Sequence, residues 1–343
     1  MFTIREVFPE DLEGLTAVAE HLNTVNLPND RAVLEGLIAH SKKSFAGQLD
    51  VFKREYLFVL VDEEQQKIIG TSMIHAQHGT RRAPHVFFRV ENEERYSYTL
   101  DRHFVHQVLR IGYNYDGPTE IGGLILLPEY RRSAEALGKS LSYVRFLFMR
   151  MHRPVFRDHV LSELLPPLES DGTSLLWEAL GRHFTGMSYQ EADRVSQSNK
   201  EFIRALFPAD SIYISLLPYS VQGLIGKVGP ETKGVEKMLR RIGFEYADRI
   251  DPFDGGPHFI AKTDDITLVK GTKSAKVVAL PAGGVGDDDG VPTGLISVER
   301  DRAPHFAATG SKFRLEGTDV GLPAATMRQL GLQPGDSVGV LPF

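Results

Sequence analysis

The stretch from Glu120 to Leu141, EIGGLILLPEYRRSAEALGKSL, contains residue types that could bind a phosphate group. Its apolar run ends at Pro128, which cannot continue a hydrogen-bonded strand, and Arg131 and Arg132 then precede a helical pattern. The first N–H groups of a helix lack internal partners and attract anions, and guanidinium groups add charge-assisted hydrogen bonds. The stretch alone is consistent both with a pyrophosphate site and with an ordinary charged turn.

The segments around this stretch are predicted to alternate between strands and helices. A short strand at the N-terminus leads into a helix that Pro9 opens, and a hairpin joins the runs Tyr56–Val61 and Ile68–Ile74. A further hairpin-like region lies in HVFFRVENEERYSYTL. After the stretch, the patterns predict a helix, a strand in HVLSEL and a helix in SLLWEALGRHF. This order indicates an α+β fold with a mixed sheet and flanking helices.

Composition excludes several classes of protein. Of the 343 residues, 42% are apolar and 24% charged, and no apolar run approaches the roughly 18 residues of a membrane-spanning helix. There is no cysteine, which rules out disulfides, a cysteine nucleophile and thiolate metal sites. The net charge of -6 argues against a nucleic-acid partner. The first residues do not resemble a secretory signal, so we expect a cytoplasmic protein without a membrane partner.

Two domains are expected. Residues 1–265 carry the alternating pattern, and residues 266–343 suggest a small β-rich C-terminal domain with a Gly- and Asp-rich loop at 280–294. The segments LWEALGRHF and MLRRIGFEY have a similar pattern of apolar residues around a glycine. An internal duplication of the first domain is therefore one option. The role of the C-terminal domain does not follow from its sequence.

The order of these segments resembles the GCN5-related N-acyltransferase fold, in which a central strand and the loop after it hold an acyl-CoA. At family level, FFRV, TEIGGLILLPEYRR, SLLWEALGRHF, NKEFIRALFPADSIYISLLP, VQGLIGKVGPET and GFEYADRIDPFDGGP resemble successive blocks of the arginine N-succinyltransferase family, over roughly residues 3 to 262. The resemblance implies transfer of succinyl from succinyl-CoA to the α-amine of arginine or ornithine in arginine catabolism. No metal is expected, the transfer is expected to be direct and without a covalent enzyme intermediate, and a homo- or hetero-oligomer remains open.

The resemblance also implies where acyl-CoA binds. Backbone groups of the central strand would face the pantetheine, while the Arg pair and the N–H groups that open the next helix would hold the pyrophosphate. The residues concerned are Leu124, Ile125, Leu126, Arg131, Arg132, Gly138, Lys139 and Ser140. The family carries two glycines, as G-x-G, in a shorter turn, whereas SAEALG has only Gly138. The contacts with the pyrophosphate are therefore expected to differ.

A second departure concerns catalysis. The proton-donating His of the family falls on Gly229 in VGPET, and glycine has no side chain that could transfer a proton. His258, directly after DGGP, is a candidate replacement, and an unengaged surface histidine is the alternative. If the family's mechanism is retained, Gly229→His is expected to raise turnover.

A cationic amine substrate calls for carboxylates. Glu120, Glu163 and Asp254 lie in family-like blocks, and Glu163 is the preferred catalytic candidate because it ends a predicted strand beside the acyl-CoA strand. Glu120 and Asp254 are candidates for substrate binding, and exposed rim positions are the alternative for all three.

The histidine pairs are predicted not to bind metal. His75 and His78 are three apart in a predicted strand and should point to opposite faces, and His103 and His106 would share a helical face in a structural role. Two other functions remain open at this point: a non-catalytic acyl-CoA-binding or partner subunit, and an N-acyltransferase with another amine acceptor.

Overall fold

The computed structural model describes residues 1–20, 29–81, 83–131, 133–279 and 291–343, and the chain forms two compact units. Unit 1 consists of Met1–Ala76, Ile121–Arg157 and Thr263–Phe343, and unit 2 of Gln77–Glu120 and Asp158–Lys262. Most of the predicted loop at 280–294 lies outside the described residues. The units do not follow the predicted division at residue 265, since the C-terminal segment is grouped with the N-terminal one.

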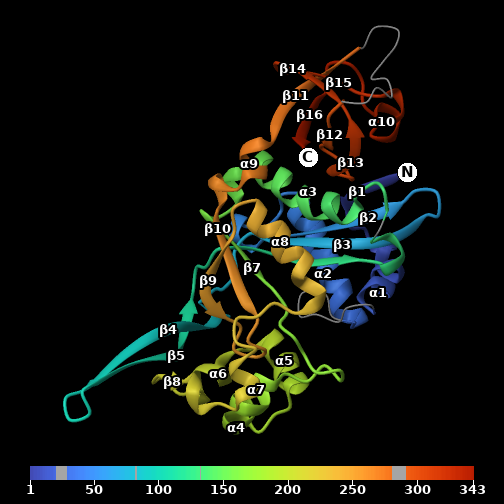
Figure 1. Ribbon diagram of the computed structural model, residues 1–343. Coiled ribbons are helices and arrows are strands. Elements are labelled where there is room, and N and C mark those ends of the chain that lie inside the picture. Colours follow the sequence, from blue (N-terminus) through green and yellow to red (C-terminus); the bar gives the residue numbers. More distant parts are fainter. Residues whose placement is uncertain (21–28, 82, 132, 280–290) are drawn as a thin grey trace. The chain divides into compact units, whose positions relative to one another are not determined.

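Unit 1 is built on a sheet with the strand order β14-β15-β11-β16-β12-β13-β1-β2-β3-β6 (Figure 1). The predicted hairpin is confirmed as the antiparallel pair β2–β3, and β1 lies between β2 and β13. The strands are β1 (Phe2–Glu6), β2 (Glu55–Asp62), β3 (Lys67–His75), β6 (Thr119–Leu126), β11 (Lys273–Val278), β12 (Thr293–Glu299), β13 (Phe306–Lys312), β14 (Arg314–Glu316), β15 (Asp319–Gly321) and β16 (Ser337–Pro342).

The helices of unit 1 cover this sheet. They are α1 (Leu12–Ala19), α2 (Arg31–Phe45), α3 (Leu137–Met151), α9 (Thr267–Gly271) and α10 (Ala324–Gln329), with 3-10 turns at Pro9–Asp11, Val51–Lys53, Pro128–Tyr130, Arg153–Val155 and Thr263–Asp265. Phe148 of α3 packs edge-on against Phe58 and Phe306, with ring centroids 5.4 and 5.2 Å apart. The C-terminal segment therefore shares one aromatic core with the N-terminal strands, a contact that buries large apolar rings.

Unit 2 has the strand order β7-β10-β9-β4-β5-β8, and the first residues of β6 pair in parallel with β7, Glu120 opposite Leu161. Its strands are β4 (His85–Ser97), β5 (Arg102–Asn114), β7 (His159–Glu163), β8 (Ile212–Tyr213), β9 (Glu245–Ile250) and β10 (Pro257–Lys262). Its helices are α4 (Arg182–Thr185), α5 (Tyr189–Ser198), α6 (Glu201–Leu206), α7 (Tyr219–Gln222) and α8 (Lys233–Arg241), with a π-helical turn at Trp177–Gly181 and 3-10 turns at Ile214–Leu216 and Pro230–Thr232.

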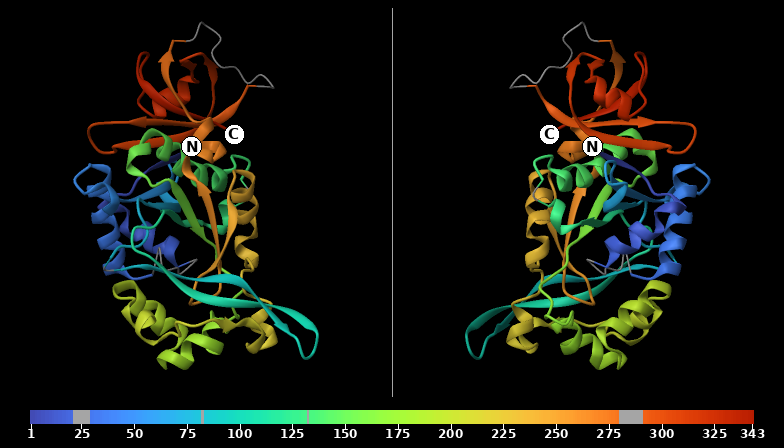
Figure 2. Two further views of the ribbon diagram at one scale, coloured as in Figure 1. Left: turned by 90° about the vertical axis from the view of Figure 1, so that its left-hand side faces the viewer. Right: turned by 90° about the vertical axis from the view of Figure 1, so that its right-hand side faces the viewer.

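The strands β4 and β5 form a long two-stranded ribbon (Figure 2). His103 and His106 lie in β5, opposite Tyr96 and Glu93, so the predicted helical face is wrong. The outer half of the ribbon is exposed on both faces, with Tyr98 and Leu100 at its turn. Because neither face there is buried, the sequence lacks the alternation that normally marks a strand.

A buried tryptophan supports the turn that follows β9. Trp177 is fully buried and stacks on Phe253, with ring centroids 5.0 Å apart and planes 7° from parallel. Gly181 is required beside it, because a Cβ there would lie 2.3 Å from the indole ring. Ser174 Oγ donates to the Phe253 carbonyl at 2.8 Å and so fixes the same turn.

Within the described residues, no helix is both long enough and apolar enough to span a bilayer.

Candidate active site

The strand β6 is kinked at Gly123, in the middle of the predicted pantetheine strand. Gly123 has a φ of 54°, and a Cβ there would lie 2.9 Å from Met73 Cγ, so a side chain would be strained and crowded. Its carbonyl accepts a hydrogen bond from Thr71 Oγ1 at 2.9 Å. Leu124 is half-buried after the kink, while Ile125 and Leu126 are buried. Contact of these three residues with pantetheine stays a prediction.

The turn after β6 folds Arg131 back onto the strand. Arg131 Nε donates to the Leu126 carbonyl at 3.0 Å, which fixes the base of the guanidinium at the end of β6. Arg132, the second member of the predicted pair, lies outside the described residues. Arg131 is exposed on the surface and remains the candidate phosphate ligand of the turn.

The helix α3 begins at Leu137, after Ala136 in a left-handed conformation with φ 51°. The N–H groups of Lys139 and Ser140 donate to the Ala136 carbonyl at 2.9 and 3.1 Å, so both are engaged within the start of the helix, and contact of Lys139 and Ser140 with a phosphate stays a prediction. Among the described residues, the N–H groups of Leu137 and Gly138 have no acceptor, which shifts the candidate anion-binding donors to this first pair. Gly138 is retained as a candidate.

The side chains with the greatest catalytic potential gather in unit 2. His78 Nδ1 lies 2.6 Å from Glu120 Oε2, His85 Nε2 lies 3.1 Å from Glu163 Oε1, and His258 Nε2 lies 3.4 Å from the same oxygen. Glu163 ends β7 as predicted, and it faces His258 of the neighbouring strand β10. We call these five side chains the histidine–carboxylate cluster.

Two histidines of the cluster have unsatisfied ring nitrogens. His85 is 1% exposed and His258 is fully buried, yet neither ring nitrogen of either residue has a hydrogen-bond partner in the described part of the chain. Their approaches to Glu163 are close, but the angles do not make hydrogen bonds. The two rings stack with centroids 5.3 Å apart. Buried polar atoms are rarely left without partners, so a water molecule or a ligand is expected to complete the hydrogen bonding here.

Burial controls the charge state of both rings. It lowers the pKa of His85 well below its usual value, and the neighbouring His78 and His258 lower it further. Burial also lowers the pKa of His258, against the opposing charges of Glu163 and Asp251. Near pH 7 both imidazoles are therefore neutral and keep an accepting nitrogen. The alternative of an exposed, unengaged His258 is wrong.

Two aspartates shape the turn beside the cluster. Asp251 Oδ1 accepts hydrogen bonds from the N–H groups of Phe253 and Asp254, and Asp254 Oδ1 accepts one from Gly256 N–H at 2.7 Å. Burial and the charge of Glu163 raise the pKa of Asp251 to about 6, and burial with Asp251 raises that of Asp254 well above its usual value. Asp254 would thus bind a cation only by ionising in response to it.

Gly229 occupies a position with no room for a side chain. Its N–H donates to the Leu165 carbonyl at 2.8 Å, and a Cβ would lie 2.6 Å from the Pro166 carbonyl oxygen. The structure therefore argues against Gly229→His as a variant that raises turnover, because the substitution would push this segment away from Leu165 and Pro166.

The sequence did not single out His85, and His78 was weighed only as a metal partner of His75. The structure separates that pair: His75 Nδ1 lies 3.4 Å from Glu55 in unit 1, whereas His78 belongs to unit 2. His85 follows Pro84 as an isolated histidine, and nothing in its sequence neighbourhood marks it.

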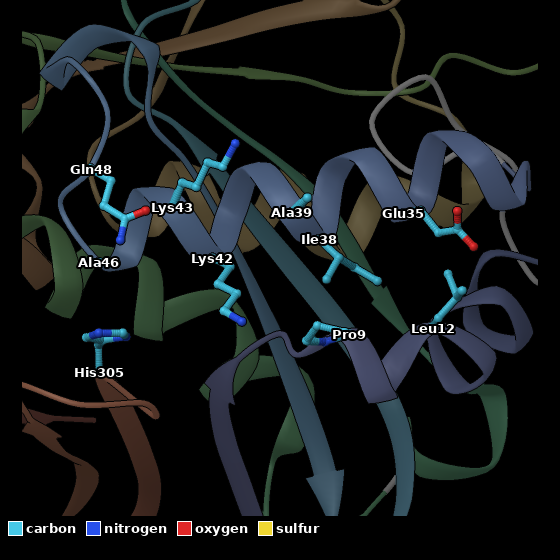
Figure 3. Close-up of a pocket in the computed structure, with 10 residues that line it drawn as sticks. All are labelled: Pro9, Leu12, Glu35, Ile38, Ala39, Lys42, Lys43, Ala46, Gln48 and His305. Atoms are coloured by element: carbon cyan, nitrogen blue, oxygen red, sulfur yellow. The ribbon is translucent and has the colours of Figure 1, made fainter.

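A pocket in unit 1 is lined mainly by α2 (Figure 3). Lys42 points between His305 and Pro9, and Lys43 points to the opposite side of the helix. His305 already lies 3.1 Å from Glu6, and none of the predicted site residues lines this pocket. We therefore describe two candidate sites, one on β6 and α3 in unit 1 and one in the histidine–carboxylate cluster of unit 2. The pocket residues are Pro9, Leu12, Glu35, Ile38, Ala39, Lys42, Lys43, Ala46, Gln48 and His305.

Comparison with known proteins gives consistent matches. The family model described as arginine N-succinyltransferase beta subunit matches residues 2–268. An arginine N-succinyltransferase of Yersinia pestis is 32% identical over 345 residues, which is 99% of this chain and 97% of that protein. An arginine N-succinyltransferase subunit beta of Pseudomonas aeruginosa is 31% identical, over 99% of this chain and 98% of that protein.

A solved structure matches the whole fold. The arginine/ornithine succinyltransferase subunit AI of Pseudomonas aeruginosa superposes with a TM-score of 0.85 at 27% sequence identity, covering 100% of this chain and 98% of that one. The predicted N-acyltransferase-like fold is thereby confirmed.

Proposed function

The chain belongs to the arginine N-succinyltransferase family, and from this premise we propose that it transfers the succinyl group of succinyl-CoA to the α-amine of arginine or ornithine. The amine nitrogen attacks the thioester carbonyl, the C–N bond forms and the C–S bond breaks. The amine loses a proton, and the departing CoA thiolate takes one up. No covalent intermediate with the enzyme is needed.

The feature that carries the proposal is the succession of β6, the Arg131 turn and α3. The strand is kinked, a guanidinium is fixed at its end, and the helix start carries N–H groups for which the described residues offer no acceptor. These features suit a pantetheine and a pyrophosphate. Leu124, Ile125 and Leu126 are the proposed pantetheine strand, and Arg131 with the N–H groups of Leu137 and Gly138 is the proposed pyrophosphate site.

The cluster in unit 2 is the proposed site of amine recognition and proton transfer. Glu163 and His258 are our proposed catalytic residues, because a neutral buried imidazole beside a carboxylate can accept a proton from the amine. Glu120 and Asp254 are proposed to attract the cationic substrate. Glu120 is 3% exposed and bound to His78, so His78 is the more accessible member of that pair.

The absence of a histidine at position 229 does not remove the reaction. Holding amine and thioester together supplies much of the rate, and a single acid or base contributes about 10²- to 10⁴-fold. The neutral His258 is the proposed substitute within the same unit.

The direct test incubates the purified chain with succinyl-CoA and a panel of basic amino acids, and follows release of free CoA. Release with arginine or ornithine, and a succinylated amine by mass spectrometry, are expected. CoA binding by calorimetry without release under any condition would instead indicate a non-catalytic subunit. A product formed only with another amine would indicate a different acceptor.

We also propose a cytoplasmic location, which agrees with the lack of cysteine. The solved relative is named as a subunit, so we propose that this chain assembles with a second copy or a related chain. Light scattering of the purified chain tests the first option.

A further inference from the structure

Three side chains of unit 2 bring possible metal-ligand atoms close together in the described part of the chain. One ligand atom from each of His78, His85 and Glu163 lies within 4.8 Å of the other two. His85 Nε2 and Glu163 Oε1 are 3.1 Å apart. This is close to the distance between two ligand atoms that are each bound at about 2.0–2.2 Å to one tetrahedral zinc ion.

The burial of His85 makes this convergence informative. Among the residues that the structure describes, neither of its buried ring nitrogens has a hydrogen-bond partner, and the short approach to Glu163 is not a hydrogen bond. A bound cation between the imidazole and the carboxylate would satisfy both groups at once. A fixed water is the competing explanation, and it would need the same polar partners.

The position of His78 adds an independent feature. Its Nδ1 is taken by the buried Glu120 carboxylate at 2.6 Å, which leaves Nε2 as the nitrogen available to a ligand. A carboxylate that holds the far nitrogen of a histidine is the usual outer partner of a metal-binding imidazole, because it fixes the ring orientation and raises the basicity of the ring.

We propose that His78, His85 and Glu163 form a binding site for a divalent transition metal ion, with Glu120 as the outer partner of His78. Two imidazoles and one carboxylate suit Zn²⁺, and three protein ligands leave a coordination position for an exchangeable group. The sequence-based expectation of no metal considered His75 with His78 and cysteine chemistry, and therefore did not reach this combination.

A second trio, Glu163, Asp251 and His258, is also compact, but it is the weaker candidate. Asp251 Oδ1 already accepts two backbone N–H groups of its own turn. His258 is thus outside the proposed ligand set, although Glu163 is shared between the proposed metal site and the proposed proton-transfer pair.

The test uses the full chain, with any affinity tag removed, after dialysis against a chelator. Zn²⁺ is added back, unbound ion is removed by gel filtration, and the metal content per chain is measured by mass spectrometry. Competition with a chromophoric chelator gives the affinity, and Co²⁺ supplies a visible spectrum. One ion per chain is expected, with Co²⁺ absorption typical of nitrogen and oxygen ligands.

Three variants and one control locate the site. His85→Gln and His78→Gln are each expected to weaken Zn²⁺ binding at least 100-fold, and Glu120→Gln 10- to 100-fold. His103→Gln, on the exposed β5 ribbon and 51% exposed, is the matched control and should bind as the parent does. Since His78 is partly exposed, its variant should keep the fold, which circular dichroism of the metal-free protein checks.

The proposal is overturned if no ion is retained at micromolar Zn²⁺, if His78→Gln and His85→Gln both bind normally, or if His103→Gln loses as much binding as they do. Metal is measured without substrates, so these results do not depend on whether the chain transfers succinyl. Conversely, a transfer assay on the metal-free chain tests the proposed function without the metal.

Discussion

Glu163 and His258 face each other across the antiparallel strands β7 and β10, with Glu163 Oε1 3.4 Å from His258 Nε2. The same oxygen lies 3.1 Å from His85 Nε2, so one carboxylate oxygen is close to two imidazoles from different strands. Any substitution of Glu163 therefore affects both neighbours, and the roles of the two histidines are better separated by changing the histidines.

Replacing His258 by glutamine should lower the rate of succinyl transfer. The amide fills most of the volume of the ring but cannot carry a proton, so kcat is expected to fall about 10²- to 10⁴-fold, with little change in the KM for succinyl-CoA. Free CoA release measures both constants. His103→Gln is the control, and unchanged kcat in His258→Gln would remove this residue from the mechanism.

Replacing Arg131 by glutamine should weaken acyl-CoA binding. Loss of a charge-assisted contact to phosphate is expected to raise the KM for succinyl-CoA about 10-fold and to reduce its dependence on salt concentration. Arg314→Gln, an exposed arginine on β14, serves as the control. Calorimetry with CoA checks the binding directly, and equal affinity in the Arg131 variant and the control would place the pyrophosphate elsewhere.

Replacing Gly229 by alanine should destabilise unit 2. A Cβ would meet the Pro166 carbonyl oxygen at 2.6 Å, and overpacking against backbone costs about 1–3 kcal/mol. Gly234→Ala in α8 is the matched control, because nothing lies within 4 Å of its Cβ and alanine favours a helix by up to about 1 kcal/mol. Urea unfolding should move the two midpoints in opposite directions; a shift of both the same way contradicts the crowding at Gly229.

Replacing Asp193 by asparagine should make stability less dependent on pH. Burial and the charge of Asp251, partly offset by Lys200, raise the pKa of Asp193 to about 6. The folded state thus prefers the protonated acid, and its stability is full below about pH 4 and falls as pH rises through 6. Because asparagine stays neutral, the variant should gain at most about 3 kcal/mol at pH 7.5 and little at pH 4.

Urea unfolding at both pH values measures this difference for the Asp193 variant. The exposed Asp210→Asn is the control and should show no such pH dependence. Equal effects of Asp193→Asn at pH 4 and pH 7.5 would mean that ionisation of the Asp193 carboxyl does not cause the pH dependence of stability.

Local patterns were enough to predict many of the elements. The runs around Tyr56 and Ile68 are apolar enough to give the β2–β3 hairpin, and Pro9 opens the turn into α1. The exposed ribbon was harder, since His103 and His106 lie where neither strand face is buried. The contact of β13 with β1 could not be read from either segment, because pairing between distant strands depends on register, not local composition.

The same limit applies to the candidate site. The place of Glu163 at the end of a strand was predictable because that strand is clearly apolar, whereas the parts of Glu163 and His258 in the site stay predictions. The approach of His85 to Glu163 depends on how β4, β9, β10 and β7 are ordered in the sheet, and no spacing along the chain encodes that order. The left-handed Ala136 before α3 could not be predicted either, because alanine rarely adopts that conformation.

The strand β1 joins the two ends of the chain, since Ile4 pairs with Leu60 on one side and with Ala308 on the other, more than 300 residues later. On the ribosome, β1 and β2 can pair early, but the other edge of β1 cannot pair with β13 until nearly the whole polypeptide has been made. Until then it is an open template for pairing with another nascent chain. Products that end before β13 should therefore aggregate, and synthesis of this protein should depend on chaperones that shield that edge.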